Sequence, residues 1–130
     1  MIVNEKAILA LTPTTDQSDL EGYFVEASGA NVAVVNSAAD IPLGVIVDGE
    51  PTTGKSTIAL SGAYAGIVTV KATATAPGTI NRGTFLTLKS DGTVQADAGS
   101  GARVQVARAL ESAAAGELFQ AILLQPVTLS

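Results

Sequence analysis

The chain has 130 residues, of which 47% are apolar and 15% are charged, and its 12 acidic and 7 basic side chains give a net charge of −5. A chain of this length and composition is expected to fold as one domain with a buried core. Because it contains no His and no Cys, it cannot supply imidazole bases, thiolate nucleophiles, His/Cys zinc sites or disulfides.

The acidic balance disfavours nucleic acid as a partner, because a phosphate backbone repels a protein of the same sign. Aromatic residues make up only 4% of the chain, which also disfavours a base-stacking surface. No run approaches the roughly 18 apolar residues of a membrane span, and no secretory signal is visible at the amino terminus. We therefore expect a protein made in a cytoplasm, with neither nucleic acid nor a membrane as partner.

Residues 1–20 contain Pro13, many hydroxyl side chains and no periodic apolar face. This segment is predicted to be an extended N-terminal arm that precedes a single β domain over residues 21–130. Two interpretations are open, a frayed terminus and an arm that becomes ordered on a partner. Deletion of the arm is expected to leave the domain folded.

From residue 22 onward, Gly and Pro recur between short runs rich in Val, Ile, Leu and Thr, which is the pattern of many short strands. This pattern predicts a mainly β fold, either a small β-barrel or a β-sandwich-like domain. The predicted strands, in chain order, cover residues 22–27, 32–35, 43–47, 56–60, 66–74, 84–89, 93–96, 104–110 and 118–124.

Local signals support two of these predictions. Val68 and Val70 alternate with Thr69, the period-two pattern of a half-buried strand. The dipeptide Asp91-Gly92 lies between two predicted strands and supplies residues that tolerate positive φ, as a tight hairpin requires.

Residues 102–120 are ambiguous, because their Ala, Leu and Glu residues favour a helix by intrinsic propensity. Against a helix, Val104 and Val106 follow the alternation of a strand, and Gly116 interrupts the segment. The last residues begin a run typical of a buried strand. We therefore predict a strand, a loop and a second strand.

An internal repeat is indicated at a spacing of about 61 residues. Residues 21–25, Glu-Gly-Tyr-Phe-Val, resemble residues 82–86, Arg-Gly-Thr-Phe-Leu. The repeat predicts two similar β units packed around a common core; the alternative is that any Gly- and Val-rich β protein resembles itself. The other matched segments are residues 45–46 with 106–107 and residues 58–60 with 121–123.

Residues 49–56, Gly-Glu-Pro-Thr-Thr-Gly-Lys-Ser, satisfy the phosphate-loop pattern G-x-x-x-x-G-K-[ST]. In such a site Lys55 would reach the β- and γ-phosphates and Ser56 would hold magnesium, but the mechanism needs a helix that begins at the lysine. The residues that follow are Gly-containing and β-branched, and they predict strands. We therefore interpret the segment as a polar loop in which Lys55 is solvated and Gly49 and Gly54 adopt backbone angles that other residues resist.

The remaining carboxylates form no catalytic set. Asp16, Asp19 and Glu21 cluster in sequence, but their spacing matches no calcium loop, so a solvated surface is expected. No catalytic, cofactor-binding or metal site is predicted, and the chain is not expected to be an enzyme. Four further carboxylates flank apolar segments or turns, where loop-end chemistry explains them: Asp40, Asp48, Asp91 and Asp97.

The order of short motifs over residues 22–124 resembles that of the small capsid decoration, or cement, proteins of tailed bacteriophages. The resemblance covers about four fifths of the chain. It is carried by the strand over residues 67–72, the Asp91-Gly92 turn, Val-Ala-Arg-Ala-Leu-Glu at residues 106–111, and Gly116 before the final strand. These motifs mark a fold and bring no active-site residues.

The resemblance implies a small β virion protein that binds the major capsid protein on the outer surface of the phage head and stabilises the shell. It also implies a homo-oligomer, with a homotrimer favoured. The arm over residues 1–20 would contact capsid subunits by adding a strand to a neighbouring sheet. Two alternatives are kept: another β-rich virion component, such as a fibre base, tail or head-completion protein, and a soluble ligand-binding β module.

Overall fold

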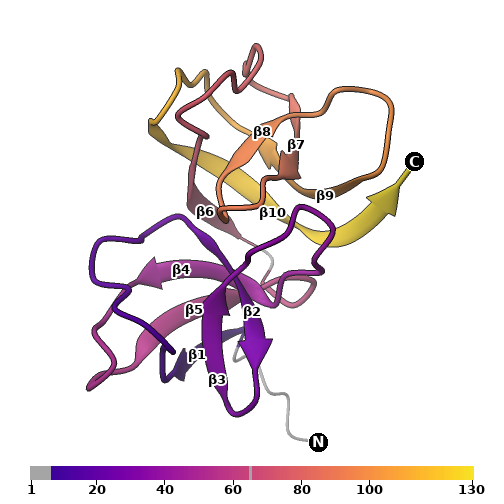
Figure 1. Ribbon diagram of the computed structural model, residues 1–130. Helices are drawn as coiled ribbons and strands as arrows, with labels where there is room; N and C mark the ends of the chain where they lie inside the picture. The colour runs from indigo at the N-terminus through magenta and orange to yellow at the C-terminus, as the bar shows by residue number, and fades with distance from the viewer. Residues whose placement is uncertain (1–6, 65) are drawn as a thin grey trace, which may run out of the picture.

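The computed structural model describes residues 7–64 and 66–130, and this part of the chain is all β (Figure 1). None of the described residues belongs to a helix that could cross a membrane. The mainly β fold expected from the sequence is thus confirmed. The strands are β1 (Ile8–Leu11), β2 (Phe24–Ser28), β3 (Asn31–Val34), β4 (Gly44–Asp48), β5 (Ser56–Leu60), β6 (Ile67–Lys71), β7 (Phe85–Leu88), β8 (Val94–Ala96), β9 (Arg103–Ala109) and β10 (Leu118–Leu129).

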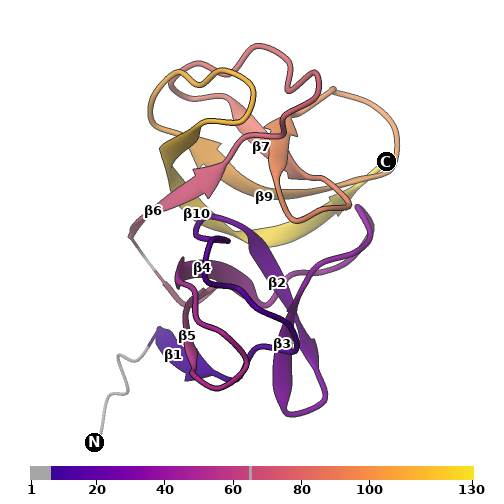
Figure 2. The ribbon, with the colours of Figure 1, turned by 60° about the vertical axis from the view of Figure 1, so that its left-hand side comes forward.

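The strands form two units with the same topology. β1 to β5 make an antiparallel sheet in the order β1-β5-β4-β2-β3, and β6 to β10 make a second in the order β6-β10-β9-β7-β8. The second order is the first shifted by five strands. We call residues 7–64 unit 1 and residues 66–130 unit 2; the two units are stacked one on the other, as Figures 1 and 2 show.

The strand register confirms the repeat and corrects one part of its alignment. Phe24 lies opposite Val45 in unit 1, and Phe85 lies opposite Arg108 in unit 2. Val45 therefore corresponds to Arg108, not to Val106, whereas residues 58–60 correspond to residues 121–123 as expected. The spacing is 61 residues at β2 and β7 and 63 at β4 and β9, because the hairpin and the next loop are each one residue longer in unit 2.

Each sheet curls until its two edges meet. In unit 1 the chain after β1 forms a parallel bridge to β3, between Pro13 and Val32, and in unit 2 the chain after β6 forms one to β8, between Ala72 and Val94. The bridges close each unit into a small barrel, so that alternate side chains point into the barrel or onto its outer face.

Two clusters of buried side chains make up the core. The interior of unit 1 is a small cluster of four fully buried residues, Val25, Val32, Ile46 and Ile58. A larger cluster fills unit 2 and crosses the junction, because Phe24, Val45 and Ala59 on the outer face of unit 1 pack among buried residues of unit 2. The two units therefore share a core across the junction, as the repeat predicts.

The local predictions are confirmed with shifts at the strand ends. Strand β6 is shorter than expected, and β10 continues to Leu129. The hairpin between β7 and β8 forms, with Gly92 at a φ of 85° and its amide donating to the Lys89 carbonyl at 3.1 Å. Residues 102–120 contain β9, a loop and the start of β10, which confirms strand, loop, strand.

Residues 7–20 differ from the arm that the composition suggests. Ile8–Leu11 form β1, which pairs antiparallel with β5. Gln17 is fully buried; its backbone amide donates to the Glu50 carbonyl at 3.0 Å and its Nε2 to the Val32 carbonyl at 3.2 Å. These residues pack as part of unit 1 because the edge of β5 and the barrel interior supply their partners. Residues 1–6 of the predicted arm lie outside the described residues.

Candidate functional site

The segment that matches the phosphate-loop pattern is a loop between two strands. Ser56 begins β5 and is fully buried, and its hydroxyl accepts a hydrogen bond from the Glu50 amide at 3.0 Å. Lys55 is exposed, and a strand follows it instead of a helix. The helix amides that would hold phosphates are therefore not formed here, in agreement with the interpretation as a polar loop.

The reason for Gly49 in this loop differs from the sequence expectation. Neither Gly49 nor Gly54 has φ in the left-handed region. A Cβ at Gly49 would instead lie 1.7 Å from the Gln17 carbonyl oxygen, so the close approach of two backbone segments requires glycine. A Cβ at Gly54 would lie 3.1 Å from Glu50 Cβ, which is a tight contact but a much smaller overlap than the one at Gly49.

Several carboxylates cap turns; the sequence predicts this role for Asp40 and Asp91 but not for Asp16. The Asp16 carboxylate accepts hydrogen bonds from the hydroxyl and amide of Ser18, which hold the pKa of Asp16 below its ordinary value. The Asp40 carboxylate accepts the Ser37 amide at 3.1 Å, and Asp91 accepts the Thr93 amide at 3.1 Å. Asp16, Asp19 and Glu21 are all exposed. Within residues 7–64 and 66–130, no three acidic side chains come close enough to hold a metal ion.

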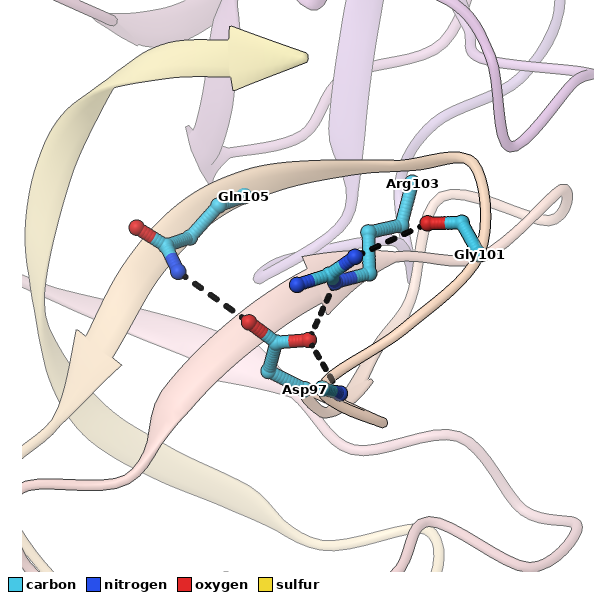
Figure 3. Close-up of polar contacts among 5 residues, drawn as sticks. Asp97, Gly101, Arg103 and Gln105 are labelled. Atoms are coloured by element: carbon cyan, nitrogen blue, oxygen red, sulfur yellow. Dashed lines mark hydrogen bonds and ion pairs between the residues drawn. The ribbon is translucent and has the colours of Figure 1, made fainter. Parts of the chain in front are cut away.

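Asp97 is the centre of the most connected polar group, in the loop between β8 and β9 (Figure 3). Its carboxylate accepts the Gly99 amide at 2.9 Å, pairs with the Arg103 guanidinium, and accepts Gln105 Nε2 at 3.2 Å. Arg103 also donates to the Gly101 carbonyl at 2.8 Å. The Gly99 amide and the Arg103 charge hold the pKa of Asp97 below its ordinary value. All donors belong to the chain itself, so the group fastens a loop.

Two hollows lie at the junction of the units. The smaller, of about 150 Å³, is lined by residues of both units, among them Ile8, Val47 and Ile67. The larger has a volume of about 260 Å³ and lies between residues 37–39 and the ends of β9 and β10. It is below the range of roughly 300–1,000 Å³ typical of ligand pockets. Its lining is mostly Ala, Val and Thr, with Arg103 already bound to Asp97. The arrangement provides no converging polar groups for chemistry.

A row of exposed side chains, three of them apolar, crosses the outer face of unit 2. Ile67 lies opposite Ile122, Ile122 opposite Arg108, and Arg108 opposite Phe85, so the row crosses β6, β10, β9 and β7. Ile67 is 56% exposed, Phe85 41% and Ile122 38%, and Arg108 lies over the Phe85 ring at 4.9 Å. We call these four residues outer row 2. Leu118, also on β10, is 49% exposed beside it.

The same row of unit 1 is covered. The register places Ile8, Ala59, Val45 and Phe24 at the corresponding positions, and we call them outer row 1. Phe24, Val45 and Ala59 are 0% exposed because unit 2 packs on them, and Ile8 at the end of the row is 40% exposed. Three of the four equivalent positions are therefore buried in unit 1 and exposed in unit 2.

Sequence reasoning missed outer row 2, although one signal points to it. The repeat aligns Phe24 with Phe85, which identifies equivalent positions on two strands. Whether such a position is covered depends on how the units stack, and a one-dimensional pattern does not carry that information.

No family model matches the chain, and no curated protein sequence matches it. Among solved structures, the fold is similar to that of the N base of the head fiber gp8.5 of bacteriophage phi29, with a TM-score of 0.61. The two chains are 16% identical, and the match covers 95% of this chain and 97% of that one. The likeness concerns the fold, and it extends over both units.

Proposed function

We propose that the chain is a structural protein of a bacteriophage virion and forms the base of an appendage on the outer surface of the head. The observation that carries this proposal is the end-to-end likeness to a head fiber base, which covers 95% of this chain and 97% of the other. A match over both stacked units supports a shared assembly role better than a match to one small barrel would, because small barrels recur with many functions.

Two further observations support a structural role on a phage particle. The order of motifs over residues 22–124 resembles that of phage decoration proteins, which reside on the same surface. In the described residues, the carboxylates of Asp16, Asp40, Asp91 and Asp97 fasten turns and loops, and outer row 2 exposes three large apolar side chains. An exposed apolar row suits a protein contact better than it suits catalysis.

A fibre base and a cement protein differ in what they do to the head. A cement protein occupies lattice sites throughout the shell, and many weak contacts together resist internal pressure. A fibre base occupies the sites from which an appendage rises. The sequence resemblance favours the first and the fold likeness favours the second, and we propose the second.

In this proposal the partner on the particle is the major capsid protein, and the base is a homo-oligomer. The decoration-protein resemblance favours a trimer. Residues 7–20 would stay in unit 1 during attachment, since β1 and Gln17 are part of that barrel.

The test is binding of the purified protein to heads of the same phage that lack it, measured by co-sedimentation and imaged by electron microscopy. We expect saturable density at symmetry-related sites on the outer surface and no change in the heat resistance of the heads. Binding that raises the heat resistance would favour the cement function. Absence of binding to any head form would contradict both.

A nucleotide titration tests the competing interpretation of residues 49–56. We expect neither ATP binding nor ATP hydrolysis by the wild-type protein or by Lys55→Ala, because the loop lacks the helix that a phosphate site needs. Hydrolysis by the wild-type protein that is lost in Lys55→Ala would overturn the structural assignment.

A further inference from the structure

The junction between the two units shows how one barrel of this fold packs against another. The β7–β8 hairpin of unit 2 reaches unit 1, where the Phe24 amide donates to the Gly92 carbonyl at 2.8 Å. A Cβ at Gly92 would lie 2.8 Å from Val34 Cγ1, which shows how closely the hairpin turn approaches β3. The hairpin and the barrel behind it leave outer row 1 without solvent contact except at Ile8.

The two surfaces equivalent to those in this contact, the β2–β3 hairpin and outer row 2, are not covered within the chain. Outer row 2 is exposed, as described above. The β2–β3 hairpin of unit 1 corresponds to the β7–β8 hairpin, and a Cβ at Gly29 in its turn would meet nothing within 4 Å. The two stacked units thus leave one hairpin and most of one row uncovered, although Ile67 at the β6 edge of that row lines a hollow with Ile8 and Val47 of unit 1. Stacked repeats are stabilised by contacts between neighbours.

The net charges of the two units have opposite signs. Residues 1–64 hold eight acidic and two basic side chains, a net charge of −6, and residues 65–130 hold four acidic and five basic ones, a net charge of +1. Arg108 lies within outer row 2, and Lys71 is the strand partner of Leu118 beside it. Arg82 donates to the Leu110 carbonyl at 3.0 Å. An acidic unit 1 is attracted to this more basic surface.

We propose that outer row 2 is the docking surface for a second copy of this chain, which presents the β2–β3 hairpin side of its unit 1. The contact between chains then repeats the contact between units inside each chain. It joins two different surfaces, head to tail, so successive copies close into a ring or continue as a fibre. The inference stands on the repeat and the charges and does not depend on the proposed virion function.

Sedimentation of the purified wild-type protein in dilute and in concentrated solution tests the association. We expect oligomers larger than the 13.0 kDa chain, with at least tenfold weaker association in 1 M salt than in 0.1 M salt, because salt screens the charges. A wild-type protein that stays monomeric at millimolar concentration would overturn the proposal.

Two substitutions test the surface, with a matched control. Ile67→Glu and Ile122→Glu insert a negative charge into outer row 2, and we expect both variants to be monomers. Ile122→Glu should unfold at a temperature close to that of the wild type, whereas Ile67→Glu should lose some stability because Ile67 also lines a hollow with Ile8 and Val47 of unit 1. Ile41→Glu is the control, because Ile41 is 58% exposed in the loop between β3 and β4; this variant should associate like the wild type. Row variants that associate normally would contradict the surface. Normal association combined with loss of head binding would assign the row to the capsid protein instead.

Engineered cysteines test the head-to-tail geometry, since the chain contains no Cys of its own. Ala30→Cys lies in the β2–β3 turn, and Thr84→Cys lies beside Phe85, at the position equivalent to Tyr23. We expect an oxidised mixture of the two variants to form a disulfide-linked dimer that neither variant forms alone. A dimer of Thr84→Cys by itself would indicate a two-fold contact and would exclude the head-to-tail arrangement.

Discussion

The two units have one strand order and opposite surfaces. Phe24 and Phe85 occupy the same register position, yet Phe24 is fully buried under unit 2 and Phe85 is open. Val35 and Asp97 also correspond, since the amide of each donates to the carbonyl of the equivalent Phe. Val35 joins the core at the junction, whereas Asp97 fastens a loop. The shared topology determines which side chains point into each barrel. Whether a side chain on the outer face is buried depends on whether the other unit packs on it.

Removal of residues 1–20 should give the largest effect, and it tests whether unit 1 is complete without them. The deletion takes away β1, the partner of β5, and the buried Gln17. We expect a loss of more than about 4 kcal/mol in the free energy of unfolding, with unit 1 unfolded in amide exchange spectra. Deletion of residues 1–6 is the control, because it leaves these contacts in place. A folded unit 1 after the longer deletion would restore the interpretation as a separate arm.

Truncation of the two equivalent Phe residues probes the comparison most directly. Phe24→Ala removes a fully buried ring from the shared core and should cost about 3–5 kcal/mol. Phe85→Ala removes a half-exposed ring and its contact with Arg108, and should cost about 1 kcal/mol in the monomer. Urea unfolding of dilute protein measures both losses. Equal losses would mean that unit 2 does not cover outer row 1 as described.

A methyl group at Gly49 should destabilise unit 1 by about 1–3 kcal/mol, since its Cβ would overlap the Gln17 carbonyl. Gly54→Ala lies in the same loop and is the matched control; it should cost less than Gly49→Ala, because its Cβ would lie 3.1 Å from Glu50 Cβ, whereas a Cβ at Gly49 would lie 1.7 Å from a carbonyl oxygen. Thermal unfolding of the two variants distinguishes them. A similar loss of stability in both variants would mean that Gly49 has no special steric requirement in this loop.

The smallest expected effect concerns Asp97, which is charged where unit 1 has Val35. Asp97→Asn weakens the contacts with Gly99 and Arg103 and should cost about 1 kcal/mol near neutral pH. Because the folded state lowers the pKa of Asp97, its stabilisation is complete above the ordinary Asp value of about 4 and is lost as the pH falls through the lower folded value. Melting temperatures from pH 7 to pH 2 should therefore converge for wild type and variant. Asp19→Asn, an exposed carboxylate of unit 1, should follow the wild type throughout.

Much of the fold could be predicted from local patterns. Alternation over residues 68–70 marks β6, and Asp91-Gly92 marks the hairpin, because side-chain direction and positive φ are properties of a few adjacent residues. The repeat was visible around Phe24 and Phe85. Its alignment failed at Val45, since two single-residue insertions change the spacing before β4 is reached.

The features that the sequence did not predict depend on contacts between distant segments. β1 has only four residues, three of them exposed, and it is a strand because the edge of β5 is available about 50 residues later. The role of Gly49 follows from the approach of Gln17, and outer row 2 follows from the stacking of the units. None of these relations leaves a periodic or compositional mark in the sequence.

The strand order also has a consequence for the sequence of events during synthesis. Every strand pair lies within one unit, and in unit 1 the most distant partners, Ile8 and Ala59, are about 50 residues apart. Synthesis from the amino terminus therefore completes all pairing partners of unit 1 at Leu60, while outer row 1 is still bare. On this basis we expect the last step of folding to be the packing of unit 2 on outer row 1. Assembly of the chains would be this final folding step carried out once more, between molecules.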